Sequence, residues 1–489
     1  MLNYIGSYFK SNCVRKLALV SLQEIKQLSD LTVIFKLNAN AVLFIIPQGD
    51  YSEIFEKLIS DIQIYLSELT IYLPVYFTYE TEEIFSVYKE LKEKYEASLT
   101  SKRTEAPNLF DYFDLTEDKL YFSLSISGPR VIKNAKMENI FGFLEVNSQH
   151  STPNPLVAIV AHYDTLGVVG DLPQGVNSNG SGVIAMLELI RILSKFYENY
   201  PSIIKYDLLF VFTSAGDVNF EGARHFIDNL EPSISENLQY VLCLDSLASM
   251  TKSNEIFMHI SRFPKEHEMS TNKLYYIFNS TSKNMGLNLT YVRKKVFLGE
   301  EYVPWEHEQF SKKKILAATL STKRECSGSN FNRTLMVDNR LNKEKLIQNI
   351  KFLVESILEF LFDYNISKYP LLQNDDKLID ELHINNLIEY VQRISRSPLN
   401  IEKGSKINND LFNTLNSYTK KAKRQVFELR DIQFYSGNSG TVYIYNVKSK
   451  IIDLFLLVGA VLYLIVIFVF VKGCKGTVNE IKSILGRSE

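Results

Sequence analysis

Residues 156–164 read LVAIVAHYD: six apolar residues without a break, then a histidine and, two positions later, an aspartate. A short apolar run of this kind is typical of a strand that is buried on both faces of a sheet. A Gly/Asn-rich loop, residues 175–182 (GVNSNGSG), follows, and residues 181–196 then place apolar side chains on one helical face. We expect Ser181 to cap this helix. The unit predicts an α/β sheet.

Further apolar runs continue the pattern on the C-terminal side. We expect strands at residues 208–213, 240–244 and 315–320 and a long amphipathic helix at residues 342–364. Alternation of strands and helices predicts a largely parallel, doubly wound sheet that helices cover on both faces. We assign this domain to residues 126–368.

The regions on either side of this domain show other sequence patterns. Residues 1–125 alternate apolar runs (41–47 and 71–76) with a helical stretch at 82–95, which predicts a small N-terminal α/β domain. Residues 369–450 are more polar, and we expect a mostly helical connector there.

The composition excludes some functions. The 489 residues carry 54 basic and 56 acidic side chains, a net charge of -2, so direct nucleic-acid binding is not expected. The basic cluster Lys420, Lys421, Lys423 and Arg424 is interpreted as a solvated helix face. Four scattered cysteines do not make a disulfide framework.

One apolar stretch is long enough to cross a membrane. Residues 454–471 (LFLLVGAVLYLIVIFVFV) contain no charge, and about 20 residues span a bilayer. We therefore predict a transmembrane helix at residues 451–472, in contact with membrane lipid, and a basic tail at 473–489. The excess of Lys and Arg after the span favours a cytoplasmic C-terminus and a lumenal or extracellular body.

Targeting signals leave two alternatives open. Residues 17–22 (LALVSL) are short for the apolar core of a signal sequence, so either the N-terminus is incomplete or the chain is inserted post-translationally with its body in the cytosol. Five Asn-x-Ser/Thr sequons do not decide between them. For a lumenal body we expect glycosylation at a subset of these, namely Asn279, Asn288, Asn332 and Asn365.

Polar residues follow the predicted strands, at the sheet edge where α/β proteins bind ligands. They are His162 and Asp164, the loop at 175–182, Gly216 and Asp217, Asp245, and His307 in the segment WEHEQF. Two histidines and three carboxylates at strand ends would suit a zinc hydrolase.

The order of these residues resembles the M28 family of dinuclear zinc aminopeptidases. The resemblance implies that His162 and Asp245 correspond to ligands of one metal, Asp217 and His307 to ligands of the other, and Asp164 to the carboxylate that orients the histidine. Two positions depart from the family: Ser178 stands where the bridging aspartate is expected, and Gly216 where the general-base glutamate is expected. We therefore expect no catalytic residue, no cofactor, and zinc binding that is lost or weak.

The segments VAIVAHYD, SNGSG, FEGARHF, VLCLDS and WEHEQF, together with the C-terminal span, resemble the nicalin family, noncatalytic M28-like membrane proteins of the endoplasmic reticulum. This resemblance implies a scaffold that acts with a nodal modulator protein, a small multipass membrane protein, the Sec translocon and the ribosome in multipass membrane protein biogenesis. The alternatives are a residual zinc metallo-aminopeptidase and a nicastrin-like receptor subunit of a membrane protease.

Overall fold

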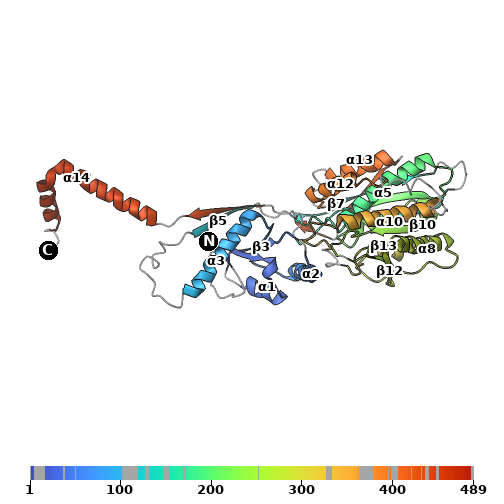
Figure 1. Ribbon diagram of the computed structural model, residues 1–489, viewed down its shortest axis with the longest axis horizontal. Helices are drawn as coiled ribbons and strands as arrows, with labels where there is room; N and C mark the ends of the chain where they lie inside the picture. Colours follow the sequence, from blue (N-terminus) through green and yellow to red (C-terminus); the bar gives the residue numbers. More distant parts are fainter. Residues whose placement is uncertain are drawn as a thin grey trace.

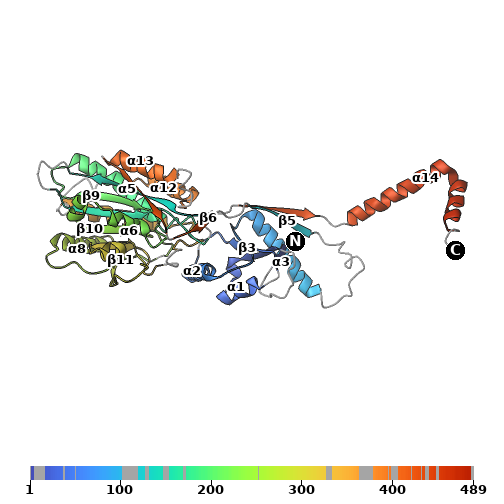
Figure 2. The ribbon, with the colours of Figure 1, turned by 180° about the vertical axis from the view of Figure 1, so that it is seen from behind.

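The computed structural model extends from a three-layered α/β body through an N-terminal domain to a projecting C-terminal helix (Figure 1; Figure 2 gives the opposite view). It describes residues 2–4, 17–36, 39–49, 51–101, 119–126, 131–146, 153–168, 172–251, 253–326, 333–362, 378–394, 396–397, 406–419, 421–430, 432–435, 440–447 and 451–485.

The body is built on an eight-stranded mixed sheet with the order β12-β11-β13-β10-β8-β9-β7-β14. The strands β13, β10, β8 and β9 run parallel in its centre. At one edge β7 pairs antiparallel with both β9 and β14, and at the other β11 pairs antiparallel with β13 and parallel with β12. The strands are β7 (Ala135–Leu144), β8 (Leu156–His162), β9 (Asp207–Thr213), β10 (Leu238–Leu244), β11 (Glu255–Ile260), β12 (Asn288–Arg293), β13 (Ala317–Ser321) and β14 (Lys423–Leu429).

Helices cover both faces of this sheet, because the central strands are apolar on both sides. One face carries α5 (Gly180–Asn199), α8 (Met269–Asn284), α10 (Lys343–Phe362), α12 (Glu381–Arg393) and α13 (Lys406–Tyr418). The other carries α6 (Glu221–Asp228), α7 (Pro232–Asn237) and α9 (His307–Lys312). The predicted α/β fold is confirmed, but the sheet is mixed rather than largely parallel.

The start of α5 differs from the prediction. Asn179, not Ser181, is the N-cap: its side-chain oxygen accepts from the Gly182 amide at 3.1 Å. Ser181 lies inside the first turn, where its hydroxyl donates to the Asn177 carbonyl at 2.6 Å. Both residue types favour caps, so the residue whose oxygen faced the free amides could not be read from the sequence.

The N-terminal domain has a four-stranded parallel sheet in the order β1-β2-β3-β4. Its elements are β1 (Leu2–Tyr4), β2 (Leu17–Ser21), the 3₁₀ turn η1 (Leu22–Glu24), α1 (Leu28–Phe35), β3 (Ala41–Ile46), α2 (Glu53–Glu68), β4 (Val75–Tyr79) and α3 (Glu82–Ser101). The apolar run at 17–22 is thus a buried strand and turn, and the fourth strand begins later than the run at 71–76 suggested.

Residues 369–450 are not a separate helical connector. Their described helices α12 and α13 pack on α5, and β14 pairs with β7 in the main sheet. Farther on, β16 (Gly440–Val447) pairs with β5 (Lys119–Ile126), and the short strands β15 (Phe434–Tyr435) and β6 (Val131–Ile132) also pair. The apolar faces of α12 and α13 are buried there because they complete the core.

The last helix, α14 (Ile451–Leu485), projects away from the body (Figure 1). Within it, Asp453–Val471 has a mean hydropathy of 3.2 and none of it is buried, so it is long and apolar enough to cross a membrane. The helix bends at Gly473, whose φ of 71° and ψ of 157° are not helical.

Candidate functional site

Four of the residues predicted from the sequence lie at the carboxyl ends of the central strands. His162 ends β8, Gly216 and Asp217 follow β9, and Asp245 follows β10. His162, Asp217 and Asp245 are each 1% exposed. The site is therefore almost fully enclosed.

Asp164 holds the turn after β9. Its carboxylate accepts hydrogen bonds from the backbone amides of Ala215 and Gly216. Burial raises its pKa to about 6, against the effect of these hydrogen bonds. Its contacts with that backbone make it a structural anchor of the 215–216 turn.

Gly216 lies directly against the ring of His162. A β-carbon added at Gly216 would lie 2.3 Å from Cδ2 of His162 and 2.7 Å from its Cβ. Non-bonded carbon atoms do not approach so closely, and the Cβ of His162 can move only if strand β8 moves with it. The position predicted for a general-base glutamate therefore has no room for a side chain in this arrangement.

His162 is paired with a carboxylate that the sequence analysis did not single out. Its Nδ1 lies 3.8 Å from Oε2 of Glu306, and the hydroxyl of Thr213 donates to Oε1 of Glu306 at 2.5 Å. Burial opposes protonation of His162, but the carboxylates of Glu306 and Asp245 outweigh it and raise its pKa. His162 and Glu306 thus form a buried histidine–carboxylate pair.

Asp217 is held by the protein backbone and by Thr334. The Leu166 amide and the Thr334 hydroxyl donate to Oδ2 at 2.6 and 2.7 Å, and the Thr334 amide donates to Oδ1 at 3.0 Å. Burial raises the pKa of Asp217. Both of its oxygens thus have protein donors.

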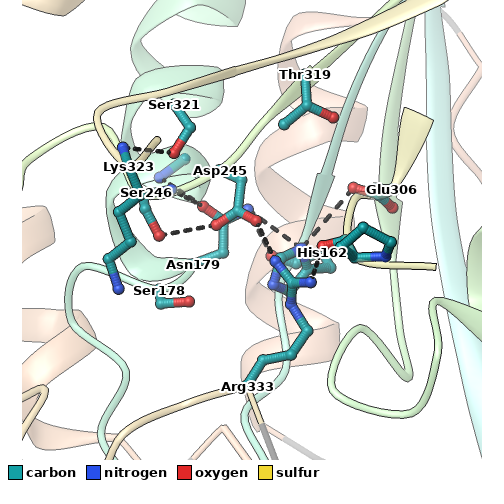
Figure 3. A network of polar contacts seen from close by, with 12 residues as sticks. His162, Ser178, Asn179, Asp245, Ser246, Glu306, Thr319, Ser321, Lys323 and Arg333 are labelled. Carbon is teal, nitrogen blue, oxygen red and sulfur yellow. Dashed lines mark hydrogen bonds and ion pairs between the residues drawn. The ribbon is translucent and has the colours of Figure 1, made fainter. Parts of the chain in front are cut away.

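Asp245 is paired with Arg333 (Figure 3). Nη2 of Arg333 donates to Oδ2 of Asp245 at 2.8 Å, and the Ser246 hydroxyl donates to Oδ1, also at 2.8 Å. Burial opposes ionisation of Asp245, but the positive charges of Arg333 and His162 hold its pKa below the usual value.

His307, which was predicted to share a metal with Asp217, lies next to Thr319 on β13. Its Nδ1 and the Thr319 hydroxyl are 2.9 Å apart, and its buried Nε2 has no hydrogen-bond partner among the residues that the structure describes. Burial, with the nearby His259 and Lys294, lowers its pKa well below the usual value. His307 is the first residue of α9 and packs against β13.

The side chain of Ser178 cannot supply a bridging charge, and the backbone of Ser178 is engaged elsewhere. Its amide donates to Oδ2 of Asp338 at 2.8 Å, and its carbonyl accepts from Thr334. In the described parts of the chain, no three His, Cys, Asp or Glu side chains are grouped so that they could hold a metal ion. The donors present do not fit the zinc pair, since a catalytic zinc takes three protein ligands.

The predicted glycosylation positions divide into two sets. Asn279 on α8 and Asn288 on β12 are exposed, whereas Asn332 and Asn365 lie outside the described residues. The fifth sequon, at Asn179, is fully buried.

Sequence reasoning missed Arg333 and Glu306. Glu306 stands in the quoted segment WEHEQF, beside the more conspicuous His307. Arg333 follows no predicted strand, so the rule that ligands lie at strand ends did not reach it. A basic residue in a polar segment could have drawn attention to Arg333, but this pattern is the same for a buried cation and for a solvent-exposed one.

The chain is similar to several known proteins. Residues 139–327 match peptidase family M28. Nicalin from Caenorhabditis elegans is 28% identical over 68% of this chain and 61% of its own length, and BOS complex subunit ncln from Danio rerio is 27% identical over 89% of this chain and 80% of its own. The chain thus spans less than two thirds of the nematode relative.

Among solved structures, the γ-secretase component nicastrin aligns with a TM-score of 0.57 and 10% identity, over 91% of this chain and 95% of that one. That similarity concerns the fold alone. The sequence matches extend over most of the chain, including regions outside the M28 segment. The chain is therefore a homologue of nicalin, with a peptidase family M28 domain at its centre.

Proposed function

We propose that this chain is a noncatalytic, membrane-anchored scaffold resembling nicalin. It acts in an endoplasmic reticulum complex with a nodal modulator protein and a small multipass membrane protein, and it assists multipass membrane protein biogenesis at the Sec translocon and ribosome. The name BOS complex subunit, carried by a relative that aligns with 89% of the chain, supports membership of a multi-subunit complex.

The observation that carries the noncatalytic role is the packing of Gly216 against His162. A peptidase needs a group that takes a proton from the attacking water, and position 216 offers neither that group nor space for it. Ser178 supplies no bridging charge. These two losses favour a pseudoenzyme without bound zinc over a residual aminopeptidase.

The proposed topology is a single pass, with a lumenal body and a cytoplasmic C-terminus. It is supported by the apolar segment Asp453–Val471 and by the basic residues that follow it. Protease added to sealed microsomes should then spare the body, and a body that is digested would contradict this orientation.

Affinity purification of the full chain from native membranes in mild detergent tests the scaffold role. We expect a nodal modulator protein, translocon subunits and ribosomes to co-purify, and their absence would overturn the proposal. The matched control is a chain in which the span at 451–472 is replaced by an unrelated transmembrane helix, which separates contacts of the body from contacts of the span.

The same preparation tests the other two functions. Near-stoichiometric zinc together with aminopeptidase turnover that His162→Ala abolishes would establish a residual enzyme. Recovery of a presenilin instead of translocon subunits would establish a nicastrin-like receptor. Either result would replace the scaffold proposal.

A further inference from the structure

The guanidinium of Arg333 is enclosed at the centre of the former metallopeptidase site. The residue is 5% exposed. Besides the hydrogen bond to Asp245, Nη1 donates to the Pro304 carbonyl, and the guanidinium carbon lies 4.5 Å from the ring centroid of Phe220 and 5.6 Å from that of Trp305. A buried charge requires such partners, because its desolvation is costly.

The partner of Arg333 is the residue that the family resemblance matches to a metal ligand. Oδ2 of Asp245 lies 2.8 Å from a guanidinium nitrogen, so one of its two oxygens already has a cationic partner. Asp217 and His162 are also close enough for their charges to interact with that of Arg333. A divalent cation bound to this oxygen of Asp245 would therefore lie against the positively charged guanidinium rather than in an open coordination site.

Arg333 also begins a segment that crosses the site, residues 333–338 (RTLMVD), which we call the strap. Next to Arg333, Thr334 binds both oxygens of Asp217. At the other end, the carboxylate of Asp338 accepts from the amides of Asn177 and Ser178 at 2.9 and 2.8 Å. The strap is therefore bonded to every loop that would have carried the metal ligands after β8, β9 and β10.

The middle of the strap belongs to the N-terminal domain. Leu335, Met336 and Val337 are buried in the core formed by β2, β3, α1 and α2. Gln63 on α2, which is fully buried, donates to the Thr334 carbonyl at 3.2 Å and accepts from the Met336 amide at 2.8 Å. The N-terminal domain is attached to the site through these residues.

We propose that Arg333 takes the place of the catalytic metal, and that its cation fixes the strap so that the old active site has become the joint between the two domains. This inference rests on the proposed loss of peptidase chemistry but is independent of any partner protein. The proposed role of Arg333 is to position the strap, and Arg333 does not act on a substrate.

The test compares substitutions in the full chain in detergent. Arg333→Met should remove the guanidinium partner of the buried Asp245 carboxylate and lower the melting temperature by roughly 10 °C. The double variant Arg333→Met/Asp245→Asn should recover a large part of that loss, because the unpaired charge is removed. Limited proteolysis should cut between the domains faster in Arg333→Met than in the double variant.

Arg396 provides the matched control. It is 1% exposed, but it donates to the carbonyl oxygens of Tyr163, Gln174 and Gly175 rather than to a carboxylate. Arg396→Met should destabilise the chain, and adding Asp245→Asn should give no recovery. If Arg333→Met and Arg396→Met respond alike to Asp245→Asn, the pairing proposed here is wrong.

Zinc gives a second readout. Zinc ions should not raise the melting temperature of the wild-type chain and should raise that of Arg333→His, which removes the resident cation and supplies a ligand. Equal stabilisation of both proteins by zinc would overturn the proposal. A failure to co-purify translocon subunits would leave these results unchanged and would count only against the scaffold function.

Discussion

A β-carbon at Gly216 would lie 2.3 Å from Cδ2 of His162, so each of the two residues restricts the position of the other. We expect Gly216→Ala to lower the free energy of unfolding by about 2 kcal/mol, because the added methyl forces strand β8 or the turn after β9 to shift. Gly299→Ala is the control, since in the described part of the chain no residue beyond its immediate neighbours has an atom within 4 Å of the added β-carbon. Denaturant unfolding of both variants measures the difference.

The same contact predicts that Gly216→Glu will not restore peptidase activity. The glutamate must first displace His162, which the family resemblance matches to a metal ligand, so the base and the ligand could not be in place together. Aminoacyl substrate turnover with added zinc should stay at the level of the wild-type chain. Turnover that rises with Gly216→Glu alone would contradict the packing described here.

Asp164 predicts a definite pH dependence of stability. Burial raises its folded-state pKa to about 6, above the ordinary value of 3.8. The folded state therefore binds the proton more tightly, and the stability from Asp164 is present at low pH and lost as the pH rises toward 6. The shift corresponds to about 3 kcal/mol. We expect Asp164→Asn to flatten the stability profile between pH 4 and 6.

Asp380 is a control with the opposite sign. The amides of His383 and Leu382 donate to it and lower its pKa, so its contribution is present above the ordinary pKa and lost as the pH falls. Asp380→Asn should therefore remove stability at neutral pH and little at low pH. A profile that Asp164→Asn leaves unchanged would show that Asp164 is not buried as described.

The central elements were predictable because local pattern and burial agree in them. The run LVAIVA forms β8, and the amphipathic segment after it forms α5. Both elements have apolar residues at the positions that are buried in the core. The antiparallel edge was not predictable: β14 joins β7 although about 280 residues separate them, and nothing local in Lys423–Leu429 identifies its partner. Long-range pairing decides such strands.

The candidate site, too, could be predicted only in part. The backbone positions of His162, Asp217 and Asp245 follow from the ends of parallel strands, so the sequence predicts that they converge. The contacts of the Asp217 and Asp245 side chains depend on the strap, which approaches from another part of the chain. This is why His307 was assigned to the site and Arg333 was not, although Arg333 is the residue that reaches Asp245.

The side chain of Asn179 joins three elements, which predicts a large effect of its removal. Its amide nitrogen donates to the carbonyls of Leu244 and His162 at 2.6 and 3.2 Å, and its oxygen accepts from the amides of Gly182 and Ser246. We expect Asn179→Ala to cost about 3 kcal/mol, because these buried groups lose their partners. Asn279→Ala, on the exposed side of α8, should cost little in the same unfolding experiment.

Exposure also predicts which sequons accept a glycan when the body is lumenal. Asn279 and Asn288 are exposed, whereas Asn179 caps a buried helix and is fully enclosed. In microsomes, Asn279→Gln and Asn288→Gln should each remove an endoglycosidase-sensitive gel shift. Loss of a shift in an Asn179 variant would contradict its burial, and absence of any shift at Asn279 and Asn288 would count against a lumenal body.

Gln63 tests the attachment of the N-terminal domain independently of any charge. Its side chain makes two hydrogen bonds with the strap backbone, to the Thr334 carbonyl and from the Met336 amide, and it is fully buried. Gln63→Leu keeps a similar volume but leaves both backbone groups unpaired, so we expect a loss of about 2–4 kcal/mol. Ser67→Ala, which removes an exposed hydroxyl on the same helix, is the control. Faster proteolysis between the domains in Gln63→Leu, with Ser67→Ala unchanged, would place the weak point at the strap; equal rates would show that the apolar contacts of Leu335–Val337 suffice to hold the domains together.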